Sequence, residues 1–241
     1  MRQLALNADV GEGMANDAEL MPYLDMASIA CGGHAGDLDS MTETVALAAA
    51  FNVSVGAHPS YPDRAHFGRH SMAIEDSALA ASLSAQLHTL RQVALAAKVE
   101  ITYVKPHGAL YNDMMRSETL LRKVLAVVRQ VLPGAKLMLL STPDHVTVSD
   151  ICVASGVAPI FEVFADRAYT RQGYLVARSE PGAVLTGEQS LSRVRDVLGR
   201  GVLRTLEGND LTIPMQSLCV HGDNPAALAT VQGIRELLPR G

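Results

Sequence analysis

Short apolar runs alternate with longer helical patterns along the chain, and this alternation restricts the fold more than any other feature. The apolar runs cover residues 4–8, 27–30, 53–57, 101–104, 137–140, 159–164 and 218–220. Helical patterns follow most of them, over residues 37–51, 75–97 and 118–132, in a stretch ending near residue 154, and over residues 225–238. Apolar strands that alternate with helices form parallel sheets buried on both faces. The sequence therefore predicts an α/β fold with a parallel sheet.

The number of units bears on how this sheet is arranged. About seven strand–helix units in 241 residues fit a closed parallel β/α barrel, and an open doubly wound sheet is the alternative. Residues 61–69 form a long loop, and residues 169–183 break the pattern as a hairpin or lid would. We find no internal repeat, low-complexity tract or linker. Residues 1–241 are therefore expected to form a single domain.

Composition excludes several classes of protein. The net charge is −5 and the basic residues are scattered, which argues against a nucleic-acid-binding protein. Three cysteines with no CxxC pair are typical of a reducing compartment rather than of a disulfide framework. The N-terminus lacks the apolar core of a signal peptide, and no stretch reaches about 18 uninterrupted apolar residues. We therefore expect a cytoplasmic protein with no membrane partner.

A short polar turn follows nearly every apolar run, and in a parallel barrel such turns meet at one mouth. Six of the eight histidines lie in or near these turns. Any one of these residues alone could be a capping or turn residue, but histidine recurs at several strand ends. This recurrence favours an active site. The candidate catalytic residues are Asp9, Glu12, His34, His58, Lys105, His107 and His221.

Two kinds of chemistry suit this set, and the sequence leaves both open. Asp9, His34 and His58 follow three neighbouring strands, and one carboxylate with two imidazoles is a plausible set of ligands for a divalent metal. The alternative is acid–base catalysis without a metal, because histidine titrates near neutral pH and a carboxylate can orient it.

Charged residues near the same turns are candidates for substrate binding. Lys105 could form a Schiff base or hold an anion, and the absence of a pyridoxal phosphate context favours the anion. Arginine forks could bind a carboxylate or a phosphate, whereas Arg69, His66 and His70 also fit an exposed loop. Asp37 also fits the N-cap of the helix that it precedes. The candidate substrate-binding residues are Asp37, Arg64, Asp166, Arg167 and Asp223.

Other common catalytic motifs are missing from the sequence. Residues 182–187 have the glycine spacing that starts a P-loop, but Glu188 and Gln189 follow in place of lysine and serine or threonine. No GxGxxG fingerprint follows a strand, and no GxSxG elbow is present. Cys31 lies beside Gly32 and His34, where an inert buried thiol is favoured over an activated one.

Taken together, the strand-end segments resemble one known family, the LamB/YcsF family. The resemblance extends from about residue 4 to residue 238. At residue 70 the chain has histidine where the family pattern leads us to expect a second arginine after Arg69, which weakens this position as an anion contact. The segments that carry the resemblance are residues 6–13, 28–37, 56–63, 67–69, 104–112, 162–169 and 219–224.

This resemblance implies a fold, a reaction and partners. The fold would be an irregular seven-stranded β/α barrel of the glycoside hydrolase/deacetylase type. The family is understood as the A subunit of a bacterial 5-oxoprolinase, which converts 5-oxo-L-proline, water and ATP to L-glutamate, ADP and phosphate. ATP would act as a Mg²⁺-bound co-substrate, and the B and C subunits of 5-oxoprolinase would be the partners. Because the chain lacks a P-loop, the phosphoryl step is expected to depend on these partners.

Two rival hypotheses come from the same residues. One is a metal-dependent deacetylase or amidohydrolase on the same barrel, which would need a bound metal and no ATP. The other is a non-enzymatic regulatory component, in which replacing His58 or Lys105 by alanine would leave the activity of the complex intact.

Overall fold

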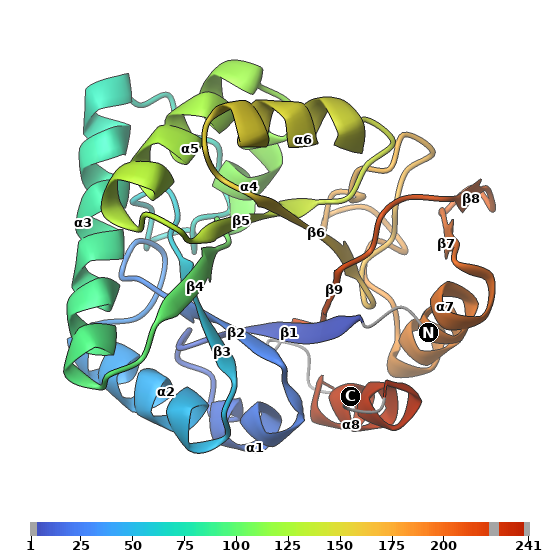
Figure 1. The fold of residues 1–241 in the computed structure, drawn as a ribbon. Coiled ribbons are helices and arrows are strands. Elements are labelled where there is room, and N and C mark those ends of the chain that lie inside the picture. Colours follow the sequence, from blue (N-terminus) through green and yellow to red (C-terminus); the bar gives the residue numbers. More distant parts are fainter. Residues whose placement is uncertain (1–3, 222–226, 239–241) are drawn as a thin grey trace.

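Seven parallel strands close into a barrel in the computed structural model, which describes residues 4–221 and 227–238. Each of the first six strands pairs with the next one along the chain, and the last strand, β9, pairs with both β6 and β1 (Figure 1). The predicted closed barrel is therefore confirmed, and the open sheet is wrong. The barrel strands are β1 (Ala5–Val10), β2 (Met26–Ala30), β3 (Ser54–His58), β4 (Ile101–Val104), β5 (Lys136–Leu140), β6 (Pro159–Phe164) and β9 (Ser217–Cys219).

Helices surround the outside of the barrel (Figure 1). A separate antiparallel pair, β7 (Leu203–Arg204) and β8 (Asp210–Leu211), lies outside the barrel sheet. The longer helices are α2 (Leu38–Ala50), α3 (Asp76–Ala96), α5 (Glu118–Val131), α6 (His145–Ala154), α7 (Gly187–Arg200) and α8 (Ala227–Leu237). The shorter ones are α1 (Asp17–Leu20), the 3₁₀ helix η1 (Met21–Tyr23) and α4 (Gly108–Met114). None of these helices, within the described residues, has the length and apolar character needed to cross a membrane.

Local sequence explains where the helices begin. The Ser117 hydroxyl accepts a hydrogen bond from the backbone amide of Leu120 at the start of α5, whose apolar stripe is buried against the barrel. Helix α7 was not among the predicted segments, although it has a clear start signal. Thr186 and Gln189 form a capping box there, each side chain accepting from the other's backbone amide.

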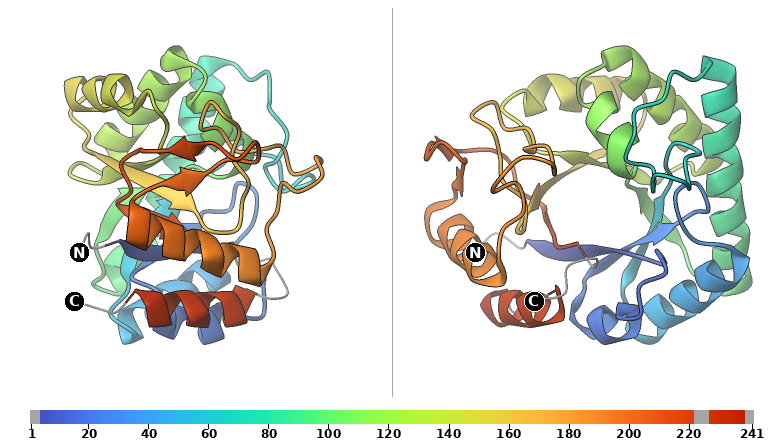
Figure 2. Two further views of the ribbon diagram at one scale, coloured as in Figure 1. Left: turned by 90° about the vertical axis from the view of Figure 1, so that its right-hand side faces the viewer. Right: turned by 180° about the vertical axis from the view of Figure 1, so that it is seen from behind.

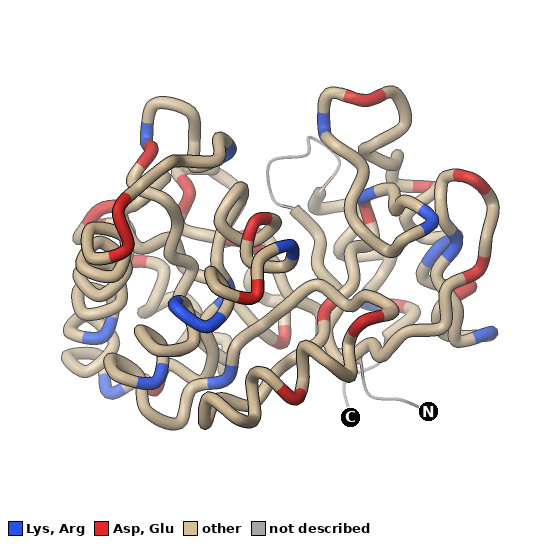
Figure 3. Tube along the Cα trace, turned by 90° about the horizontal axis from the view of Figure 1, so that it is seen from above, with Lys and Arg blue, Asp and Glu red and all other residues tan. Residues whose placement is uncertain are grey.

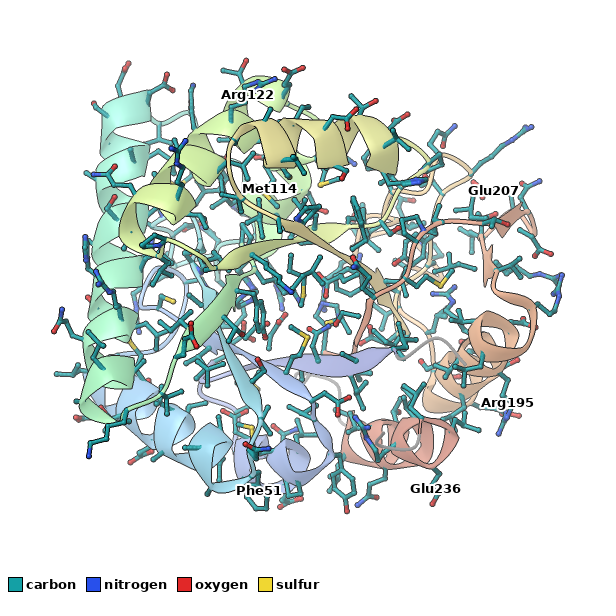
Figure 4. All side chains as sticks on the ribbon, in the orientation of Figure 1. Phe51, Met114, Arg122, Arg195, Glu207 and Glu236 are labelled. Atoms are coloured by element: carbon teal, nitrogen blue, oxygen red, sulfur yellow. The ribbon has the colours of Figure 1, made fainter. Side chains whose placement is uncertain are left out.

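The inside of the barrel is packed with side chains, many of them polar (Figure 4). Alternate residues of a strand point to the same face, so Asn7 and Asp9 of β1 both reach the interior. Across the barrel, the Asn7 amide donates to the Ser217 hydroxyl at 2.7 Å. Gly56 pairs in register with Tyr103, and a Cβ at Gly56 would lie 2.2 Å from the Tyr103 ring. The missing side chain of Gly56 is thus what makes room for this tyrosine.

The carboxyl ends of the strands open at the end of the barrel opposite to the chain termini. Figure 2 shows the segments around residues 61–75 and 165–186 standing together at this end, while both termini lie at the other. Acidic and basic residues are mixed along the chain, with no large region of one sign in the view of Figure 3. The mouth of the barrel is therefore shaped by two long loops.

Candidate active site

A buried lysine lies at the centre of the strand ends. Lys105 follows β4, and its ammonium lies 2.9 Å from Asp9 Oδ1 and 3.1 Å from Glu162 Oε2. Asn7 Oδ1 and Cys219 Sγ each lie 3.2 Å from the same nitrogen. We call these five residues the ion network. Since an ammonium has three N–H donors and this one has four acceptors around it, Lys105 already has a full set of partners.

The charges of this network are fixed by mutual contact. Burial alone would lower the pKa of Lys105, but Asp9, Cys219 and Glu162 raise it well above its usual value. Burial alone would raise the pKa of Asp9, but His58 and Lys105 hold it well below its usual range. Lys105 is therefore a cation and Asp9 an anion. A permanently protonated lysine is no nucleophile, which argues against a Schiff base.

Three histidines and one glutamate converge beside this network. Their ligand atoms, one from each of Glu12, His34, His58 and His107, all lie within 4.8 Å of one another. The shortest separations are 2.9 Å between His34 Nε2 and Glu12 Oε1 and 2.9 Å between His58 Nε2 and His107 Nδ1. We call these four residues the histidine cluster. Its donor atoms are of the type that holds a divalent metal ion.

The composition of this cluster corrects the metal ligands proposed from the sequence. That set was Asp9, His34 and His58, and only the two histidines belong to the cluster. The Asp9 carboxylate instead contacts the Lys105 ammonium, and its other oxygen lies 3.4 Å from His58 Nε2. Glu12 and His107 take part because they follow β1 and β4, whose carboxyl ends face the same mouth.

A histidine–aspartate pair lies at another side of the mouth. Asp166 is buried after β6 and accepts hydrogen bonds from the backbone amide and the ring Nδ1 of His221, both at 3.0 Å. The His221 ring stacks on Phe164, with the ring centroids 5.3 Å apart. Since Asp166 holds the Nδ1 proton, Nε2 is the ring nitrogen left to exchange a proton with a substrate.

One cavity of about 340 Å³ connects these groups. This volume is enough for a small metabolite. Asp9, Glu12, His58, Lys105, His107 and His221 all line it. Four arginines line it as well: Arg69 from the loop before α3, Arg116 after α4, and Arg167 and Arg178 from the loop after β6.

The loop before α3 packs directly on the histidine cluster. Gly68 has φ +62°, and a Cβ there would lie 2.9 Å from the Cβ of His34 and 3.1 Å from the His107 ring. The Gly68 carbonyl accepts a hydrogen bond from the Ala109 amide at 2.9 Å. A glycine at this position therefore allows the loop to close over the cluster.

The segment 169–183, predicted as a hairpin or lid, contributes directly to the cavity. Tyr169 and Leu175 form an antiparallel bridge within it, and Arg167 and Val184 form a second bridge at its base. The buried Arg167 guanidinium donates to the carbonyls of Val176 and Ala183. These contacts hold the segment at the mouth.

Several residues proposed from the sequence lie elsewhere. Asp37 is exposed and caps α2, accepting from the Ser40 amide at 2.9 Å. Arg64 donates to the carbonyls of Gly32 and Gly36, so it braces the turn after β2. Neither side chain lines the cavity. Asp223 lies outside the described residues.

Two further predictions concerned residues near the mouth. His66 and His70 are exposed and stack on each other, and His66 also contacts Asp63. Burial raises the pKa of the Cys31 thiol to about 12, as fits an inert cysteine.

Residues inside the strands were missed by the sequence reasoning. Glu162 is fully buried in β6, where it contacts Lys105 and accepts hydrogen bonds from the Tyr111 hydroxyl at 2.7 Å and the Asn7 amide at 3.1 Å. A charged residue within an otherwise apolar run was the available signal. It marks a strand position that faces the polar interior of the barrel.

Comparisons with known proteins agree with this architecture. The chain is 44% identical to the A subunit of 5-oxoprolinase from Pseudomonas fluorescens, over 99% of this chain and 98% of that protein. It is 43% identical to the A subunit of 5-oxoprolinase from Chromohalobacter salexigens, over 96% of this chain and 95% of that protein.

The solved structure of a lactam utilization protein from Thermus thermophilus is also similar. It superposes with a TM-score of 0.89 at 34% identity, covering 99% of this chain and 96% of that one. The model of the LamB/YcsF family matches residues 4–240. The chain therefore belongs to the LamB/YcsF family.

Proposed function

We propose that this chain is the A subunit of an ATP-dependent 5-oxoprolinase, which opens the lactam of 5-oxo-L-proline to L-glutamate as ATP becomes ADP and phosphate. One observation carries the proposal: a single cavity is lined both by groups that can transfer protons and by four arginines. The names of the full-length relatives and of the similar solved structure support the substrate class. Residues 1–241 would act as one catalytic domain.

The reaction requires the groups that this cavity brings together. A lactam carbonyl is a poor electrophile, and transfer of a phosphoryl group to its oxygen activates the ring carbon. Water then adds to that carbon, the carbon–nitrogen bond breaks, and the nitrogen takes up a proton. A second water releases phosphate from the acyl phosphate. His221, oriented by Asp166, is the proposed donor of the proton to nitrogen, and the histidine cluster is the proposed base for water.

The arginines account for the charge of the proposed substrate. The 5-oxoproline carboxylate and a phosphoryl group are both anions that guanidinium forks bind well. Arg69, Arg116, Arg167 and Arg178 lie around the cavity, whereas the Lys105 ammonium is already surrounded by the ion network. We therefore assign substrate anion binding to the arginines, and to Lys105 the neutralisation of buried carboxylates.

We further propose that Mg²⁺-bound ATP reacts in cooperation with the B and C subunits of 5-oxoprolinase. In this chain, the residues that follow the P-loop-like start at 182–187 serve a helix: Gln189 completes the capping box of α7 with Thr186. A P-loop would instead need a lysine that reaches the phosphates. The relatives are named as one lettered component of an enzyme, which is consistent with such partners. A cytoplasmic location remains a prediction, which three buried free cysteines support.

Glutamate release tests this proposal. The purified chain, its two proposed partners and the complete mixture should be incubated with 5-oxoproline and Mg²⁺-ATP, and glutamate and ADP measured. We expect glutamate only from the complete mixture, and a His221→Gln variant should lower its rate. A complete mixture that forms no glutamate would overturn the proposed reaction. A chain that reaches the full rate without partners would overturn the division of labour.

The histidine cluster also favours a second candidate, a metal-dependent amide hydrolase. Glu12, His58 and His107 line the cavity with ligand atoms suited to a metal ion. The ATP requirement separates the two candidates, because such a hydrolase would cleave amides in the absence of ATP. Loss of all hydrolysis when ATP is omitted would exclude it.

A further inference from the structure

Two backbone carbonyls determine which ring nitrogens of His58 and His107 carry a proton. The Lys105 carbonyl lies 2.6 Å from His58 Nδ1, and the Phe67 carbonyl lies 3.0 Å from His107 Nε2. A carbonyl oxygen can only accept, so both of these nitrogens donate. In the neutral rings, the opposite nitrogens, His58 Nε2 and His107 Nδ1, then present lone pairs. These two nitrogens lie 2.9 Å apart, so a positive charge is needed between them.

Glu12 places an anionic oxygen at the same point. Its Oε1 lies 3.6 Å from His58 Nε2 and 3.4 Å from His107 Nδ1. Three atoms with these separations can all lie about 2.1 Å from one common point, which is the length of zinc bonds to imidazole nitrogen and carboxylate oxygen. The three donors therefore have the spacing of ligands around one ion.

Each of the three donors also has a supporting partner, as is usual around metal ligands. The two histidines have the carbonyls described above, and Glu12 Oε1 has His34 Nε2 at 2.9 Å. His34 stacks on His107 with the rings only 5° from parallel, so the two rings cannot both direct a lone pair in their own plane at one ion. His34 is not among the residues that line the cavity, whereas the three donors are.

We propose that Glu12, His58 and His107 bind one divalent transition-metal ion of the zinc type, with His34 as a positioning residue and the open coordination positions facing the cavity. One carboxylate with two imidazoles is a common set of ligands for such ions at catalytic sites. When bound, the ion acts as a Lewis acid toward water or a carbonyl oxygen. The proposal concerns metal binding alone and holds whatever the substrate is.

Zinc binding by the full-length chain tests the site directly. Protein freed of metal with a chelator should be titrated with Zn²⁺ by calorimetry, and its metal content measured by mass spectrometry after gel filtration. Titration with Co²⁺ adds an absorption spectrum that reports the coordination geometry. We expect one ion per chain. The competing occupant of the same position is a proton on His58, in which case the chain leaves gel filtration without metal and the proposal fails.

Variants assign the bound ion to these residues. Glu12→Gln and His107→Ala should each weaken Zn²⁺ binding by at least about 100-fold, and His34→Ala by about 10- to 100-fold with stoichiometry unchanged. The matched control is His66→Ala/His70→Ala, which removes the exposed donor group that these residues form with Asp63. The control should bind Zn²⁺ as the wild type does.

Two results from the variants would contradict the site. One is tight binding that survives in Glu12→Gln and His107→Ala, and the other is binding that disappears in the control. Circular dichroism spectra of each metal-free variant show whether it is folded. Glu12→Gln keeps the size of the side chain, so it tests the ligand even if His107→Ala does not fold.

Discussion

Asp166 accepts two hydrogen bonds from one residue, the backbone amide and the ring Nδ1 of His221, both at 3.0 Å. Asp166→Asn keeps the size of this side chain but removes its charge, and with it the preference for a proton on Nδ1. In the reconstituted complex, kcat should fall by about 10- to 100-fold with little change in KM, because general acid catalysis contributes on this scale. Asp150→Asn, an exposed position on α6, is the control. A change confined to KM would speak against the proposed role.

The same pair predicts how stability depends on pH. Burial alone would raise the pKa of Asp166, but His221 and Arg167 hold it below its usual value. A carboxyl whose pKa is lower in the folded state stabilises the protein above its unfolded pKa of about 4, and this contribution is lost as the pH falls through the folded pKa. The difference in unfolding free energy between wild type and Asp166→Asn should therefore shrink from about pH 6 to about pH 3. Urea denaturation at several pH values measures it, and a difference that grows with acid would contradict the prediction.

Lys105→Met should destabilise the fold strongly. The substitution leaves the buried carboxylates of Asp9 and Glu162 without the ammonium that lies within 3.1 Å of both. Removing one partner of a buried ion pair costs about 3–5 kcal/mol of unfolding free energy. Lys136→Met, at an exposed position of β5, should change stability by less than about 0.5 kcal/mol. Equal effects of the two substitutions in chemical denaturation would show that the network does not stabilise the barrel.

Gly56→Ala tests the packing inside the barrel. The added methyl group would lie 2.2 Å from the Tyr103 ring, so the barrel must shift or the ring must move. We expect a loss of about 1–3 kcal/mol in unfolding free energy. The same substitution in a Tyr103→Leu background should cost clearly less, because the atoms that it meets are gone. A double-mutant cycle measures this coupling, and additive effects would be inconsistent with the contact.

The cysteines should be unreactive in the folded protein. All three are buried, and burial raises the pKa of Cys31 to about 12 and that of Cys152 to about 11. Since the thiolate is the reactive form, a thiol reagent at about pH 8 should modify none of them until denaturant is added. Cys31 reacting at the rate of a free thiol in native buffer would show that the turn after β2 opens.

The sequence allowed the mouth of the barrel to be predicted because parallel strands deliver their carboxyl ends to one place. His58, His107 and His221 could therefore be grouped without knowing any distance between them, and all three line one cavity. The same logic does not say which side chains touch. Asp9 faces Lys105 and Glu12 faces the histidines, a division that depends on side-chain directions across the barrel.

Other features were not predicted because their signals were read for another purpose. The spacing of Thr186 and Gln189 marks the start of α7, but the neighbouring glycines had been compared with a phosphate-binding loop. Glu162 lies inside an apolar run, and only the pairing of distant strands shows that its side chain meets Lys105. Asp37 precedes a helix as a capping residue should, and the structure gives it that contact.

Strand β9 joins β6 to β1, and this closure has a consequence for the order in which the protein can be made. A growing chain that has not yet reached Ser217 holds six strands with two open edges, which are prone to pair with other chains. At this stage the Asn7 amide also lacks the Ser217 hydroxyl, its partner across the barrel. Closure joins segments from the two ends of the chain, so neither half can assemble the site while it is being synthesised. Folding of this barrel during translation is thus bound to wait for nearly the last residues to leave the ribosome.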